Sequence, residues 1–161
     1  MDRSAVNDLI TRHANLMKEV MSLSGWDILI LLDSTLAASD GWMKRGEAVW
    51  KLEYERATIT LNPDALDNPV KVLDTLRHEL IHLVLAPYYQ IYDIAAVAGE
   101  GNEKLVTLTD HIYTRSMEQA VLAVERMLNN LGFTPANILA GKWVPADRTT
   151  AGREPDDYGG V

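Results

Sequence analysis

Residues 77–85 read RHELIHLVL, an HExxH pattern inside an apolar run. Because an α-helix rises about 1.5 Å and turns about 100° per residue, His78 and His82 project from one face, roughly 6 Å apart along the axis. This spacing allows both imidazoles to bind one metal ion. Glu79 lies farther round the helix, outside the chelate but within reach of a water on that metal.

The helix that carries the motif is predicted over residues 69–86. Asn68 can cap its N-terminus, Pro69 has the backbone angle of a first helical residue, and Pro87 ends or kinks it. Apolar residues occupy most of the circumference, so the helix must be buried. Buried His, Glu and His side chains need a partner that offsets their desolvation, and a divalent metal is the obvious one.

Zinc is the metal that this pattern favours. Neutral imidazole ligands leave zinc electron-poor, so the pKa of a bound water falls to about 7. Glu79 would take the proton of that water as the water attacks a polarised carbonyl, and would pass it to the leaving amine. The pattern predicts a zinc hydrolase with His78 and His82 as metal ligands and Glu79 as general base.

Composition limits the partners and the ligand types. The chain has 161 residues, a net charge of −8 and no cysteine. Any metal must therefore be held by His, Asp or Glu. An acidic surface does not attract nucleic acid or an anionic membrane, and the longest apolar run, residues 28–32, is too short to span a bilayer. We expect a cytoplasmic protein with a peptide or protein substrate.

One domain fits this length, and we expect it over residues 1–140. Residues 141–161 are rich in Pro, Asp, Arg, Thr and Gly, which predicts a flexible C-terminal tail.

Hydrophobic periodicity predicts further helices. Apolar residues three and four apart mark residues 2–23 and a second segment from Ser116 to Leu131, where Ser116 and Gln119 could form a capping box. Residues 88–98 are expected to form a short helix. Residues 103–111 are expected to form a loop with some helix.

Strands are predicted between the first helix and the motif helix. The compact apolar run WDILILLD predicts a central strand over residues 26–33, and two further strands are predicted over 47–54 and 56–61. Residues 34–46 between them are expected to form a loop. The predicted fold class is α+β, with a small, mainly antiparallel twisted sheet packed on the motif helix and other helices around it.

A strand ending in Asn62, the RHELIHLVL helix and a later helix containing EQAVLAVERML resemble the minimal zincin metallopeptidases of bacteria and phages. These include the SprT-like and anti-repressor-protease groups and small phage metallopeptidases. The resemblance covers residues 58–131. It implies a zincin-like fold, a zinc cofactor and peptide-bond hydrolysis, with an extended substrate that pairs with the strand preceding the motif helix.

Two histidines leave a tetrahedral zinc short of one protein ligand. The metzincin pattern HExxHxxGxxH is excluded, because Leu85 and Tyr88 occupy its Gly and last His positions. Gluzincins use a Glu from a later helix, and here Glu118 and Glu125 are candidates that lie two turns apart, too far to share one ion. The resemblance favours Glu118, since EQAV matches the E-x-A-V form of those families. Glu125 and His111 are the alternatives, and both glutamates could also be solvated surface residues.

Three residues, Tyr92, Tyr113 and Arg115, are candidates for stabilising the oxyanion of a tetrahedral intermediate. Two rival interpretations remain open at this point. One is a catalytically inactive zinc-binding protein of the same fold that acts as a structural or interaction module, and the other is a helical interaction module without metal. Metal content separates the last from the others, and the activity of Glu79→Gln separates an enzyme from an inactive zinc protein.

Overall fold

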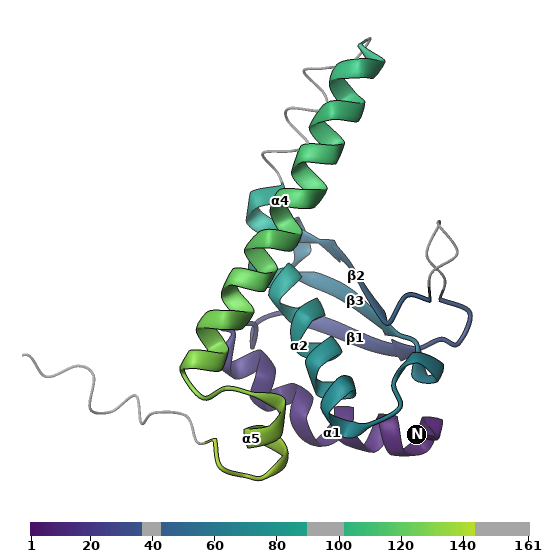
Figure 1. Cartoon of the computed structure of the whole chain (residues 1–161), viewed down its shortest axis with the longest axis vertical. Coiled ribbons are helices and arrows are strands. Elements are labelled where there is room, and N and C mark those ends of the chain that lie inside the picture. Colours follow the sequence, from purple (N-terminus) through teal and green to yellow (C-terminus); the bar gives the residue numbers. More distant parts are fainter. Residues whose placement is uncertain (37–42, 90–101, 144–161) are drawn as a thin grey trace, which may run out of the picture.

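A computed structural model describes residues 1–36, 43–89 and 102–143 of the chain (Figure 1). The fold combines a small sheet with several helices, which confirms the predicted α+β class. The helices are α1 (Arg3–Val20), α2 (Pro69–Val84), α4 (Glu103–Asn130) and α5 (Pro135–Leu139). The strands are β1 (Asp27–Leu32), β2 (Gly46–Lys51) and β3 (Arg56–Leu61), with 3₁₀ turns at Leu52–Tyr54 and Pro63–Ala65.

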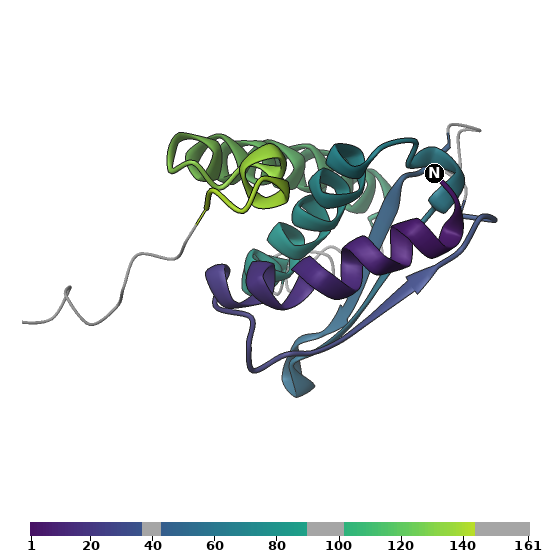
Figure 2. The ribbon, with the colours of Figure 1, turned by 90° about the horizontal axis from the view of Figure 1, so that it is seen from below.

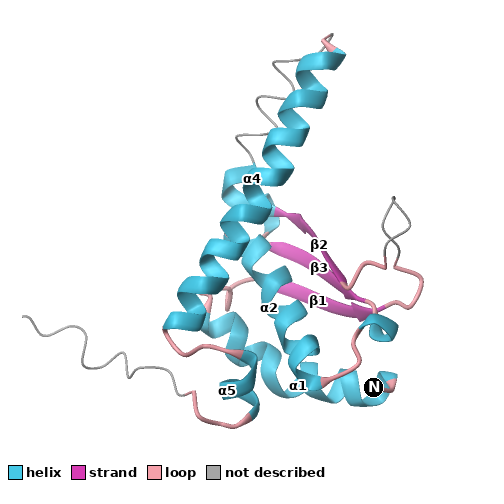
Figure 3. Ribbon diagram, viewed as in Figure 1, coloured by secondary structure: helices cyan, strands magenta, loops and turns pink. Residues whose placement is uncertain are grey.

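The sheet has three strands in the order β1-β3-β2 (Figure 3). Strand β1 runs parallel to β3, whereas β2 runs antiparallel to it, so the sheet is mixed rather than mainly antiparallel. A tight turn that ends at Glu55, with φ +48°, reverses the chain and returns β3 between the two earlier strands. The prediction that residues 26–33 form the central strand is therefore wrong. Strand β1 is an edge strand in which Leu29 and Leu31 are exposed.

The described helices α1, α2, α4 and α5 lie on one face of the sheet (Figure 2). Helix α2 contacts α1, β2, β3, α4 and α5, and ten of its residues are buried, as the apolar circumference predicts. Its N-terminus is capped as expected, because the side chain of Asn68 accepts a hydrogen bond from the Lys71 amide at 3.0 Å. Residues 86–89 are again helical, so Pro87 follows a break at the end of α2. Most of the predicted short helix, 88–98, lies outside the described residues.

Helix α4 begins earlier than its apolar stripe predicts. It starts at Glu103, where the side chain of Asn102 accepts a hydrogen bond from the Leu105 amide at 3.1 Å. The capping box predicted at Ser116 is wrong, because Ser116 lies inside the helix. The first half of α4 extends beyond the sheet (Figure 1) and exposes apolar side chains such as Leu108, so burial does not impose a stripe there.

The C-terminal segment stays against the body as far as Trp143. Its ring packs edge-to-face on Phe133, with ring centroids 4.7 Å apart. The rest of the predicted tail, residues 144–161, lies outside the described residues. None of the helices in the described part of the chain has the length and apolar character needed to cross a membrane.

The buried Arg77, directly before the first motif histidine, ties α2 to the end of α4. Its side chain is 3% exposed. One guanidinium nitrogen donates to Asn129 Oδ1 at 2.7 Å and to the Phe133 carbonyl at 2.8 Å, and the other donates to Asp74 Oδ1 at 2.9 Å. These bonds fix the position of α4 relative to the motif helix.

Replacing Arg77 by Met is expected to lower the free energy of unfolding by about 3 kcal/mol, because the buried Phe133 carbonyl loses its donor and the inter-helix bonds are lost. Urea denaturation measures this change. Arg56→Met is the control, since Arg56 forms an exposed ion pair with Asp27 at 3.4 Å. Exposed pairs contribute less than about 1 kcal/mol. Equal destabilisation by the two variants would contradict the role given to Arg77.

Candidate metal centre

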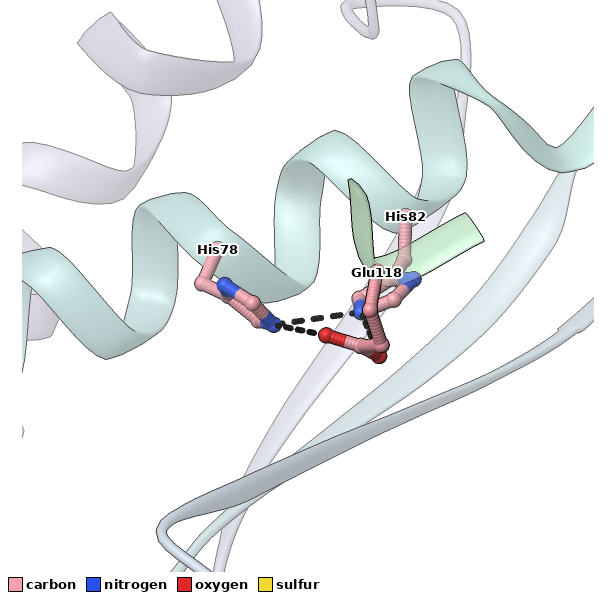
Figure 4. Close-up of side chains that lie close together, drawn as sticks. All are labelled: His78, His82 and Glu118. Carbon is pink, nitrogen blue, oxygen red and sulfur yellow. Dashed lines mark hydrogen bonds and ion pairs between the residues drawn. The ribbon is translucent and has the colours of Figure 1, made fainter. Parts of the chain in front are cut away.

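The two motif histidines lie side by side on α2, as the i and i+4 spacing predicts (Figure 4). Their Nε2 atoms are 3.2 Å apart, and the ring planes are inclined by 72°. Both Nε2 atoms therefore point toward a common position in front of the helix.

Glu118, from α4, completes a group of three (Figure 4). Its carboxylate oxygen Oε2 lies 3.6 Å from His78 Nε2, and its other oxygen, Oε1, lies 3.4 Å from His82 Nε2. A tetrahedral zinc with bonds of 2.0–2.1 Å has ligand atoms about 3.3–3.4 Å apart. The distances of 3.2, 3.4 and 3.6 Å in this group are close to that spacing, so the three residues could hold such an ion. The structure thus places the expected third residue beside both histidines.

The alternatives to Glu118 lie elsewhere. Glu125 Oε1 is 3.0 Å from His78 Nδ1, the nitrogen that faces away from the group. Metal-bound histidines commonly donate this second ring N–H to a carboxylate, which fixes the ring and its tautomer. Glu125 is therefore suited to orienting His78, a role that sequence reasoning did not anticipate. His111 is exposed, two turns before Glu118, and is not in the group.

Glu79 lies beside the group and is only 6% exposed. Burial raises the pKa of Glu79 to about 7, against the opposing effect of positive charge on His78 and Lys44. A carboxyl group with a pKa near neutral pH is suited to taking up and releasing a proton under physiological conditions.

His82 is held in the state that a metal ligand requires. Burial lowers the pKa of His82 to about 4, and repulsion from His78 and Lys44 acts in the same direction. The imidazole is therefore neutral at pH 7, with a lone pair available for a metal.

A cavity of about 260 Å³ opens beside the three residues. Helix α2, Glu118 and strand β2 form its walls. The lining residues from β2 and from the segment before it are Lys44, Gly46, Glu47, Ala48 and Trp50. A second cavity, of about 320 Å³, shares Gly46, His78 and Glu79 with the first. Glu79 therefore borders open space in both cavities.

Among the strands that the structure describes, β2 is the edge strand beside the site, because it pairs only with β3. The resemblance implied that a substrate pairs with the strand before the motif helix, which is β3. That expectation is wrong for this sheet, because β3 is already paired with β1 on one side and with β2 on the other.

Gly46 allows β2 to approach α2 closely. A Cβ atom at this position would lie 2.7 Å from Glu79 Oε1 and 2.9 Å from Thr75 Cγ2. Such distances are shorter than van der Waals contact, so any other residue would displace the Glu79 carboxylate. The position of the Glu79 carboxylate therefore requires glycine at residue 46.

Tyr89 is a site residue that sequence reasoning missed. It lines the first cavity, and its Oη lies 3.5 Å from His82 Nδ1. Burial raises the pKa of Tyr89, as do the carboxylates of Glu118 and Glu79, while a hydrogen bond with Tyr113 lowers it. Tyr89 follows His82 by seven residues, two turns of a helix. Because Pro87 lies between them and predicts the end of the helix, the sequence does not indicate that the two residues are neighbours.

The three proposed oxyanion residues have different positions. Tyr92 lies outside the described residues. Tyr113 packs on Tyr89 with ring centroids 4.8 Å apart, so it borders the site through that residue. Arg115 is exposed and does not line either cavity at the metal group.

No family model matches the chain, and it matches neither a curated protein nor a solved structure. The functional interpretation therefore depends on the geometry and chemistry of the site.

Proposed function

We propose that the protein is a zinc-dependent peptidase in which His78, His82 and Glu118 hold the metal and Glu79 is the general base. One observation carries this proposal. Two imidazole nitrogens and a carboxylate face one another at 3.2–3.6 Å, directly beside a buried glutamate.

When bound there, zinc would supply a Lewis acid that polarises a carbonyl and lowers the pKa of a water. Glu79 takes the proton from the attacking water and later gives it to the amine that leaves. In the metal-free protein, burial raises the pKa of Glu79 to about 7, which favours the uptake of a proton by this carboxylate. His78 is oriented by Glu125 of α4, whose Oε1 lies 3.0 Å from His78 Nδ1.

The outer edge of β2, which has no strand partner among the described residues, supports an extended peptide as substrate. On its other side this strand pairs with β3, and its residues form one wall of the cavity beside Glu79. An extended chain can add to such an edge through backbone hydrogen bonds, which positions its amide bonds along the cavity. A peptide therefore matches the site better than a compact metabolite does.

The test is metal-dependent hydrolysis of a fluorogenic peptide library. We expect the zinc-loaded protein to cleave members of the library, to lose this activity when a chelator removes the metal and to recover it when zinc returns. Cleavage that persists without metal would contradict the mechanism. Stoichiometric zinc without cleavage of any peptide would favour the inactive zinc-binding protein.

Gly46→Ala is expected to reduce kcat by about 10-fold or more while leaving zinc affinity near that of the parent. The new methyl group displaces the carboxylate of Glu79, and a shift of about 1 Å in a catalytic group has effects of this order. Gly25→Ala is the matched control, because its Cβ would meet only Glu55 Oε2, at 3.5 Å. A Gly46→Ala enzyme with parental kcat would show that Glu79 does not need this position.

A further inference from the structure

The second motif histidine has an outer partner of its own. Tyr89 Oη lies 3.5 Å from His82 Nδ1, on the ring nitrogen opposite the one that faces His78 and Glu118. His78 has the corresponding contact with Glu125, at 3.0 Å. The Nδ1 atom of each histidine thus contacts a different group, a carboxylate for His78 and a phenol for His82.

The tautomer determines the direction of the hydrogen bond. A neutral imidazole whose Nε2 lone pair faces a metal must carry its hydrogen on Nδ1. His82 Nδ1–H is then the donor, and the hydroxyl oxygen of Tyr89 is the acceptor. In this arrangement the tyrosine fixes both the tautomer and the orientation of the ligand, as outer partners of metal-bound histidines do.

Two aromatic rings from other elements pack against the ring of Tyr89. Trp50, from β2, packs against it edge-to-face with ring centroids 4.4 Å apart. Tyr113, from α4, packs on it with ring centroids 4.8 Å apart. Aromatic pairs with this geometry contribute about 0.5–1.5 kcal/mol beyond the area they bury. The hydroxyl therefore has a defined place relative to His82, although Tyr89 itself follows the end of α2.

We propose that Tyr89 is the positioning residue of His82, with its hydroxyl accepting the Nδ1–H of that ligand and with Trp50 and Tyr113 holding its ring. This inference rests on the proposed metal site. Tyr89 acts through His82, so its contribution is to metal affinity and to the orientation of the ligand. The stack also joins β2, the helical residues 86–89 and α4.

The test compares Tyr89→Phe with Tyr88→Phe. The first variant keeps the aromatic stack and removes only the hydroxyl, and the second changes the neighbouring tyrosine, which is 60% exposed and does not line the cavity. Competition with a chromophoric zinc chelator gives the affinities. We expect Tyr89→Phe to bind zinc about 10-fold more weakly than the parent, the usual effect of losing an outer partner. Tyr88→Phe should bind zinc as the parent does.

Nuclear magnetic resonance of the zinc-loaded proteins provides a second readout. The Nδ1–H proton of His82 should exchange slowly with water in the parent and rapidly in Tyr89→Phe. The Nδ1–H proton of His78, bonded to Glu125, should be the same in both and serves as an internal control. A general loosening of the site would speed the exchange of both protons with water, whereas loss of the Tyr89 hydroxyl alone would speed only the exchange of the His82 proton.

Parental zinc affinity together with an unchanged His82 signal in Tyr89→Phe would overturn the inference. Parental affinity with reduced turnover would also overturn it, and would assign the hydroxyl to the substrate. A parent protein that takes up no zinc would overturn the metal site and this inference together. The zinc affinity is measured without any peptide cleavage. A parent that binds zinc but cleaves no peptide would therefore contradict only the proposed peptidase activity. Weaker zinc binding by Tyr89→Phe would still support the positioning role of Tyr89.

Discussion

The Glu79→Gln protein is expected to bind zinc as the parent does and to hydrolyse peptides about 10²–10⁴-fold more slowly. The substitution preserves the size of a side chain that is 6% exposed, so the packing around it stays intact. An amide, however, cannot take a proton from the attacking water. Values of kcat measured on protein of verified zinc content test this expectation.

Glu47→Gln is the matched control for this experiment. Glu47 lines the same cavity, but its carboxylate is paired with Lys44 at 2.6 Å and its side chain is 41% exposed. We expect its kcat to stay within a few-fold of the parental value, since exposed pairs have small effects. A Glu79→Gln protein as active as Glu47→Gln would mean that another group is the base.

Loss of the Glu118 carboxylate is expected to weaken zinc binding by more than the roughly 10–100-fold that outer-partner changes cost. Its oxygens lie 3.6 and 3.4 Å from the two histidine Nε2 atoms, and no cysteine exists to replace it. Glu118→Ala leaves two imidazoles, fewer protein ligands than a tetrahedral zinc site needs. Chelator competition measures the loss.

Three further variants rank the alternatives to Glu118. Glu125→Ala should weaken zinc binding by about 10-fold, because His78 loses the acceptor of its Nδ1–H. Glu125→Gln retains an acceptor oxygen and should recover most of that affinity. His111→Ala should have no effect. If Glu125→Ala or His111→Ala released zinc while Glu118→Ala retained it, the third ligand would have to be reassigned.

Local patterns predicted the motif helix well, because its determinants are close together in the sequence. The cap at Asn68, the apolar circumference and the i, i+4 histidines all act within one helix. The choice of Glu118 came from a resemblance, and the structure places this residue beside both histidines.

Features that depend on long-range packing were not predictable in this way. The order of the strands follows from how the chain returns through β3, which no local pattern encodes. The start of α4 was missed because its first half, with Leu108 exposed, lacks the contrast between buried and exposed faces that periodicity detects. Asn102 supplies a cap, but such residues are also common in loops.

The outer contacts of the site were missed for a similar reason. The sequence predicts Glu125 as an alternative metal ligand or a solvated surface residue, because its contact with His78 depends on how α4 crosses α2. Tyr89 reaches His82 only because the chain turns at the end of α2, and Gly46 matters only because β2 passes over Glu79. Sequence spacing within one element cannot reveal a contact made between elements.

Zinc content of the purified protein tests the central claim most directly. Elemental analysis of chain purified without chelators should find one zinc ion per molecule in the parent. It should find none in His82→Ala, provided circular dichroism shows that this variant is folded. A parent without zinc, whose melting temperature does not rise when zinc is added, would contradict the metal centre, as would a His82→Ala protein that retains one zinc per chain.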